Sequence, residues 1–151
     1  MSYHRACCCI GPCGCHPDDD AAAGWDVTIS GLTLDTVTAT SVGTLVSVSL
    51  DAPGTISLDY ACYWFGQIGT ARFSDGNDYP VFADLSKSVG PDLRILSAWI
   101  AIGGAENYEI FYYAEADCSA SLDGETVANQ APSGPPHLAT DGTATLARID
   151  P

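Results

Sequence analysis

From residue 25 onward, hydrophobic and polar side chains alternate along the chain with a period of two. The hydrophobic positions of the first such segment are Trp25, Val27 and Ile29, and polar residues lie between them. This period is typical of a β-strand that buries one of its faces. Gly31 predicts the end of this strand or a bulge in it.

The same alternation returns in later segments that are separated by turn residues. It predicts strands over residues 37–42, 46–51, 55–64, 108–116 and 142–149, the last as an edge strand beside the N-terminal strand. Residues 93–102 are apolar at nearly every position, which predicts a strand covered on both faces in the middle of the fold. Residues 81–85 predict a short edge strand or a single helical turn. Residues 74–80 predict a turn, with a cation-binding loop as the alternative.

The whole pattern predicts an all-β protein. No segment shows a sustained helical period, and short strands at regular spacing are typical of an antiparallel β-sandwich or jelly roll. A chain of 151 residues is long enough for one domain with its own core. We therefore expect a β-sandwich domain over residues 21–151, preceded by a short, irregular, Cys-rich N-terminal segment over residues 1–20. The loop over residues 127–137 is expected to cross the surface or to contact a neighbouring subunit.

The N-terminal segment contains five of the seven cysteines, all within residues 7–15, with His4 and His16 on either side. Thiolates and imidazoles are the ligands that zinc and iron–sulfur clusters use. We expect this segment to be an anchor or a metal knot that holds zinc or an iron–sulfur cluster. The expected ligands are Cys9, Cys13, Cys15 and His16. His4 is an alternative to His16 as the fourth ligand. Disulfides formed after release from the cell, and thiols that bind nothing, stay open as alternatives.

The charge of the chain restricts its partners. Five basic residues against nineteen acidic ones give a formal net charge of −14. A surface of this charge repels phosphate groups, so we expect neither nucleic acid nor an anionic membrane as a partner. The sequence contains no apolar run long enough to cross a bilayer, and it begins without a secretory signal, so membrane insertion is not expected.

The sequence also lacks the motifs of common enzymes. It has no Gly-x-Ser-x-Gly elbow, no His-Glu-x-x-His helix and no Walker loop, and we expect no enzyme. His137 is interpreted as a surface residue. Aromatic side chains are the candidates for ligand binding, because they can stack on sugar rings, although core packing is their commoner role. The candidates are Tyr63, Trp64, Tyr112 and Tyr113.

Three stretches carry a resemblance to a known group of proteins. They are the run Cys-Cys-Cys-Ile-Gly-Pro-Cys-Gly-Cys over residues 7–15, Trp-Asp-Val-Thr-Ile-Ser-Gly over 25–31 and Gly-Thr-Ala-Thr-Leu over 142–146. The chain resembles small single-domain proteins of bacteriophages and related bacterial genomes, which join a cysteine-rich head to a β-sandwich body. The resemblance covers both ends of the chain and transfers no catalytic residue.

This resemblance implies a non-enzymatic structural component of a bacteriophage virion, such as a capsid decoration, head-spike or tail protein. Its expected partners are other virion proteins and copies of itself, since such parts occupy repeated positions. The alternative is a carbohydrate-binding module that recognises a surface polysaccharide, for example a host surface glycan.

Overall fold

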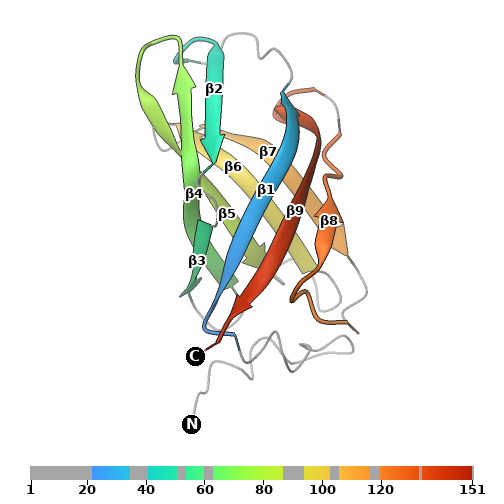
Figure 1. The fold of residues 1–151 in the computed structure, drawn as a ribbon. Coiled ribbons are helices and arrows are strands. Elements are labelled where there is room, and N and C mark those ends of the chain that lie inside the picture. The colour runs from blue at the N-terminus through green and yellow to red at the C-terminus, as the bar shows by residue number, and fades with distance from the viewer. Residues whose placement is uncertain are drawn as a thin grey trace.

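A computed structural model describes residues 22–34, 41–50, 54–59, 63–86, 94–102, 106–115, 120–132 and 134–150, with main chain alone at 54–59, 63, 64 and 140. The predicted Cys-rich segment, residues 1–20, lies outside these residues. All regular structure within them is β-strand (Figure 1). The strands are β1 (Gly24–Leu34), β2 (Leu45–Leu50), β3 (Gly54–Asp59), β4 (Tyr63–Phe73), β5 (Asp78–Ser86), β6 (Arg94–Ile102), β7 (Glu106–Glu115), β8 (Thr126–Ala128) and β9 (Ala139–Ile149).

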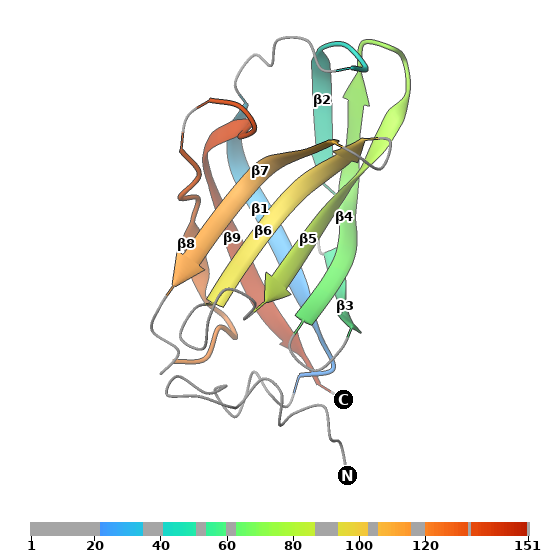
Figure 2. The ribbon, with the colours of Figure 1, turned by 180° about the vertical axis from the view of Figure 1, so that it is seen from behind.

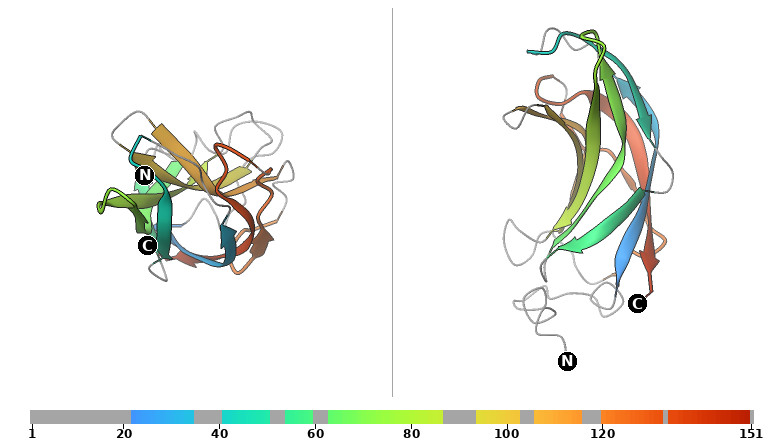
Figure 3. Two further views of the ribbon diagram at one scale, coloured as in Figure 1. Left: turned by 90° about the horizontal axis from the view of Figure 1, so that it is seen from above. Right: turned by 90° about the vertical axis from the view of Figure 1, so that its left-hand side faces the viewer.

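The strands form one continuous antiparallel ladder that curls over on itself. Its order is β7-β6-β5-β4-β3-β1-β9-β8, and β2 pairs with β4 beside β3. The curl places β1, β9 and β8 opposite the layer formed by β4 to β7 (Figures 1 and 3). The prediction of an all-β, antiparallel sandwich is confirmed. Strands β3 to β7 follow one another in space as they do in the chain, which is a meander.

The core lies between the two layers, and the first strand enters it as the alternation predicts. Trp25, Val27 and Ile29 are buried, whereas Ser30 is exposed. Each buried side chain of this size stabilises the fold by about 1.5–3 kcal/mol. Gly31 has a φ of +67°, and the register between β1 and β9 shifts beside it, so the predicted bulge is confirmed.

Several predicted segments differ from the structure. The strand predicted over residues 142–149 as an edge strand belongs to β9, which pairs with β1 on one side and with β8 on the other. Ser41 and Val42, the described end of the strand predicted over 37–42, form a turn. The single strand predicted over residues 55–64 is two strands, because the chain reverses after Asp59 and Leu58 pairs with Trp64. Alternation continues across this reversal, and no glycine or proline marks it. The segment over 81–85 is neither an edge strand nor a helical turn. It belongs to the nine-residue strand β5, which pairs with both β4 and β6.

The segment between β8 and β9 closes the curled sheet along its β7 edge. We call its described residues, 129–132 and 134–138, the strap. Gln130 N–H donates to the carbonyl oxygen of Tyr112 at 2.7 Å, and Leu138 N–H donates to that of Glu109 at 2.7 Å. The loop predicted over 127–137 therefore contacts its own sheet. Its composition indicated a loop, but only the tertiary fold supplies the strand edge that binds its main chain.

Candidate binding face

The outer side of β4 to β7 carries two cross-strand rows of side chains, and Figure 2 shows these strands from that side. Residues directly opposite each other in neighbouring strands share a face of the sheet. The first row is Gln67, Phe82, Trp99 and Glu109, and the second is Phe65, Asp84, Ser97 and Tyr112. We call Phe65, Phe82, Trp99, Asp84, Ser97 and Tyr112 the outer aromatic face.

Alternation along β5 explains how the sequence builds this face. Val81, Ala83 and Leu85 are buried in the core, so the residues between them point outward. Phe82 and Asp84 are accordingly half-buried. A strand in the middle of the sheet thus presents an aromatic ring and a carboxylate on its outer, partly exposed side.

Three aromatic rings on this face pack against one another. The ring centroids of Phe65 and Phe82 lie 4.8 Å apart in a stacked pair. Trp99 lies 5.1 Å from Phe82 and 5.9 Å from Phe65. Ring pairs of this kind contribute about 0.5–1.5 kcal/mol each beyond their buried area. The contacts hold the rings in one arrangement, so a ligand that stacks on them immobilises few additional side chains.

Asp84 lies beside these rings. Its carboxylate accepts hydrogen bonds from Ser97 Oγ at 2.8 Å and from Trp99 Nε1 at 3.4 Å. Burial raises the pKa of Asp84 above its ordinary value, and these hydrogen bonds oppose the shift. The face therefore combines apolar rings with a partly desolvated acceptor that is already oriented by its neighbours.

The structure separates the aromatic residues proposed from the sequence. Tyr112 lies on the outer aromatic face, directly opposite Ser97. Tyr113 pairs with Leu96 and faces the core, where it is 9% exposed and burial raises its pKa. Tyr63 and Trp64 begin β4 opposite Ser86 and Leu85, and only their main chains are described.

A bulge in β7 explains why the alternation of residues in this strand predicts the wrong faces for its side chains. The sequence pattern places Tyr108, Ile110 and Tyr112 on one side. In the structure, Ile110 is an extra residue between Glu109 and Phe111 in the pairing with β6, and it is fully buried. Tyr108 therefore packs against the core, whereas Tyr112 lies on the outer side. A bulge of one residue inverts the two faces.

Phe65, Phe82 and Trp99 were not among the candidates chosen from the sequence. They lie in three different strands, and each looks like an ordinary strand residue in its own segment. A hint exists in β5, where Phe82 falls between two small apolar residues. The residues converge only once the register of the β4, β5 and β6 pairs is known.

The proposed metal ligands, Cys9, Cys13, Cys15 and His16, lie outside the described residues, so metal binding at this cluster stays a prediction. Among the residues that the structure describes, no group of three or more His, Cys, Asp or Glu side chains gathers into a metal site. His137 was interpreted as a surface residue, but it is half-buried and its Nδ1 lies 2.8 Å from Glu109 Oε2.

The turn between β4 and β5 forms as predicted. Asp75 accepts hydrogen bonds from the main-chain N–H of Asn77 at 2.9 Å and from the hydroxyl of Tyr79 at 2.6 Å. The hydrogen bond from Tyr79 is the main cause that lowers the pKa of Asp75. Asp78 is bound by Arg72. Both carboxylates are thus occupied by donors of the turn and of the two strands that it joins, which does not favour the alternative of a cation loop.

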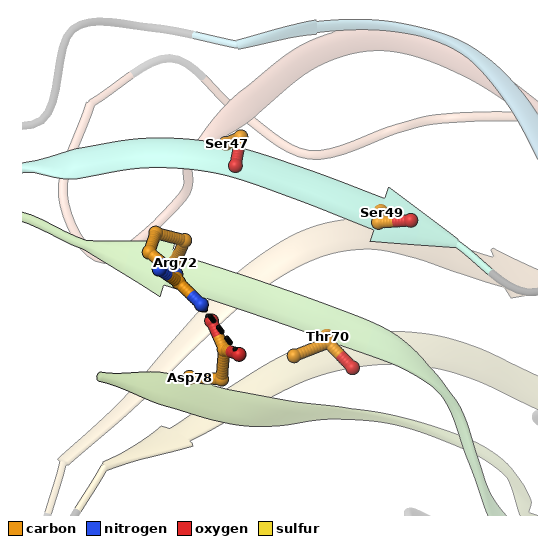
Figure 4. Close-up of a pocket in the computed structure, with 5 residues that line it drawn as sticks. All are labelled: Ser47, Ser49, Thr70, Arg72 and Asp78. Atoms are coloured by element: carbon orange, nitrogen blue, oxygen red, sulfur yellow. Dashed lines mark hydrogen bonds and ion pairs between the residues drawn. The ribbon is translucent and has the colours of Figure 1, made fainter. Parts of the chain in front are cut away.

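A hollow of about 500 Å³ lies on the outer side of β2, β4 and β5 (Figure 4). Arg72 donates to both carboxylate oxygens of Asp78, at 2.5 and 2.8 Å. An exposed pair of this kind contributes little to stability, but the two charges neutralise each other. The lining is otherwise hydroxyl-bearing, and the full set is Ser47, Ser49, Thr70, Arg72 and Asp78.

Comparison with known proteins gives no match: neither a family model, nor a curated protein, nor a solved structure matches this chain. Its fold and its outer aromatic face are therefore interpreted from its own residues. The part of the chain that the structure describes contains no helix with the length and apolar character needed to span a bilayer.

Proposed function

We propose that this protein is a non-enzymatic binding module that recognises a carbohydrate through the outer aromatic face, as a component of a bacteriophage particle. One observation carries the binding role. The three-ring cluster of Phe65, Phe82 and Trp99 is partly exposed beside the oriented carboxylate of Asp84. Aromatic rings pack against the C–H faces of sugars, and a carboxylate accepts hydrogen bonds from sugar hydroxyls.

The shape and charge of the face favour a particular class of carbohydrate. The rings lie on the side of a sheet, so a polymer chain can run across several strands of it. Gln67 and Glu109 are the two ends of the first row and add polar groups there. With a net charge of −14, the protein repels acidic polysaccharides at long range. We therefore expect a neutral or amino-bearing glycan.

The particle role rests on the sequence resemblance, and it is compatible with glycan binding. A decoration, spike or tail protein is present in many copies, and weak sites on a repeated array bind a polymer far more strongly than one site does. In this proposal the sandwich presents the face, and the cysteine-rich segment anchors the domain to other virion proteins.

Glycan-array binding of the purified protein tests the binding role. We expect binding of wild type, and a loss of affinity of about tenfold when Trp99→Ala or Phe82→Ala removes a ring. Thr126→Ala is the control, because Thr126 is an exposed residue of β8, in the layer opposite the outer aromatic face. Binding by no glycan, or equal binding by all variants that keep the β-sheet circular dichroism of wild type, contradicts the proposal.

The particle role needs a separate test. Mass spectrometry of purified particles from a phage that encodes this chain should detect the protein at a copy number comparable to other structural proteins. Absence from intact particles contradicts this part of the proposal and leaves the glycan-binding part standing.

A further inference from the structure

Strands β1 and β2 separate at one end of the sandwich, and each leaves one edge that no other described strand pairs with. β2 pairs with β4 along one edge, and β1 pairs with β3 only over residues 24–27. Within the described ranges, no strand pairs with the other edge of β2, or with that edge of β1 from Thr28 onward. Figure 1 shows the two strands diverging. We call residues 29–34 and 45–50 the β1–β2 rim.

The exposed large hydrophobic side chains of the described surface gather on the rim. A groove of about 260 Å³ runs along it, and its lining is Ile29, Ser30, Gly31, Leu32, Leu34, Val48 and Leu50. Among the described residues, the exposed large hydrophobic side chains are Leu34 and Val46, at 36% and 64% exposure. Both belong to the rim. Exposed apolar surface that gathers in one place marks an interaction site.

The rim also lacks charge, which restricts what covers it. Residues 27–34 and 41–50 contain no charged side chain, although the chain carries a net charge of −14. The charged side chains of the neighbouring hollow, Arg72 and Asp78, neutralise each other (Figure 4). Two copies of so acidic a protein repel each other wherever carboxylates meet. The described residues of the rim bring no carboxylate to such a contact.

Strand β2 carries none of the residues that usually protect a sheet edge. Exposed edges are commonly blunted by lysine or proline, and the sequence of β2 is Leu-Val-Ser-Val-Ser-Leu. The pairing of β2 with β4 shifts in register between Leu45 and Ser47, and from Ser47 onward the side chains of β2 alternate between its two sides. Ser47 lies on the outer, hydroxyl-bearing side, whereas Val48 and Leu50 line the apolar groove.

We infer that the β1–β2 rim is the contact between copies of this chain, and that a second copy docks its own rim on it about a two-fold axis. The edge of β2 then pairs with the same edge of the partner in antiparallel orientation, because a two-fold axis brings identical strands together in opposite directions. The groove is covered by the apolar residues of the partner. This contact is independent of the outer aromatic face.

Sedimentation of the full-length protein in reducing buffer, over a dilution series, tests this contact. We expect wild type to form dimers, and Val46→Lys or Ser49→Lys to run as monomers, because each places a charge at the interface. Both variants reduce the net negative charge, so their dissociation cannot result from a larger net repulsion between the acidic copies and must arise at the contact itself. The matched control, Ala147→Lys on the exposed side of β9, should stay dimeric.

Two outcomes overturn the inference. One is a wild-type protein that stays monomeric at every dilution, and the other is a dimer that survives both rim substitutions. Raising the ionic strength should shift wild type toward the dimer, because salt screens the repulsion between acidic copies. Trp99→Ala should leave the dimer intact, which separates a failure of this contact from a failure of glycan binding.

Discussion

Glu109 and His137 contact each other through both main chain and side chain where the strap lies along β7. We call this contact between the strap and β7 the seam. The two residues form a parallel bridge, and His137 Nδ1 lies 2.8 Å from Glu109 Oε2. Leu138 N–H donates to the Glu109 carbonyl beside them. The seam joins β7 to the strap, so the edge of the sheet that carries Tyr112 is held in place by a segment without regular structure.

The first prediction concerns Asn129, which connects the strap to β7. Its Oδ1 accepts hydrogen bonds from the N–H groups of Tyr112 and Ala131, both at 3.0 Å. Asn129→Ala leaves both donors without this acceptor and should lower the free energy of unfolding by about 1–3 kcal/mol. Urea denaturation measures this loss. Asn129→Asp retains the oxygen and should lose less, so equal losses in the two variants contradict the assigned role.

The second prediction concerns the close approach of β2 and β4 at Gly69. A Cβ atom at this position would lie 2.3 Å from the carbonyl oxygen of Ser49 and 2.9 Å from the Cα of Leu50. Gly69→Ala therefore forces the two strands apart and should destabilise the protein by about 1–3 kcal/mol. Thermal or urea denaturation measures the effect. Ser47→Ala, on the same strand pair, should change stability by less than about 0.5 kcal/mol.

The third prediction is a pH dependence that arises from Asp84. Burial raises its pKa in the folded state above the ordinary value of 3.8, so the folded protein binds this proton more tightly than the unfolded chain. The tighter proton binding stabilises the folded protein at pH values below the pKa that Asp84 has in the unfolded chain. This stabilisation is lost as pH rises through the pKa that Asp84 has in the folded protein. The amide of Asp84→Asn does not ionise, so the stability of this variant should not show that decrease with rising pH.

Urea denaturation of both proteins between about pH 4 and neutrality measures the difference. The unfolding free energy of Asp84→Asn, relative to wild type, should increase with pH over this range and then become constant. Two parallel curves contradict the prediction. The same substitution should weaken glycan binding, because the amide presents one acceptor oxygen where the carboxylate presents two.

The fourth prediction concerns Arg94, a cation that is 9% exposed at the start of β6. It donates to the carbonyl oxygen of Ala120 at 2.6 Å and to the carboxylate of Glu115. Glu115→Ala leaves this buried charge without its carboxylate and should cost on the order of 2 kcal/mol, since Glu115 is partly solvated. The double variant Arg94→Met, Glu115→Leu should cost less than Glu115→Ala alone. A larger loss in the double variant contradicts this account of the pair.

The fifth prediction concerns the cysteine-rich segment. Protein purified under reducing conditions should carry near-stoichiometric zinc or iron, and replacing Cys13 and Cys15 by serine should release it. Elemental analysis measures the metal. Cys62→Ser is the control and should retain it. Freshly reduced wild-type protein without metal contradicts the prediction and favours the alternatives of disulfides or unligated thiols.

Much of the fold followed from local pattern. Trp25, Val27 and Ile29 were assigned correctly to the core, because side chains in a strand alternate whatever its partners are. The strand β6 and its central place follow from its apolar run, but the prediction that both of its faces are covered is wrong on the outer side, where Ile95 and Trp99 are only half-buried. The reversal between β3 and β4 was missed, since residues 60–62 contain no turn-forming glycine or proline.

The candidate site followed far less from the sequence. Tyr112 was selected and lies on the outer aromatic face, but Tyr113 was selected beside it and faces the core. Phe82 and Trp99 were not selected at all. Their importance depends on their being opposite each other in the register of β5 and β6, which no local pattern contains.

By itself, the sequence determined an acidic, all-strand domain with a cysteine-rich start and a first strand whose buried face is known. These properties depend on composition and on the period of two, which are local. The tertiary structure alone decided which aromatic rings share the outer face, which segment closes the sheet and which edges no other described strand pairs with. The reason is physical: register and bulges are set by pairing between distant segments, and a shift of one residue moves every side chain to the opposite face.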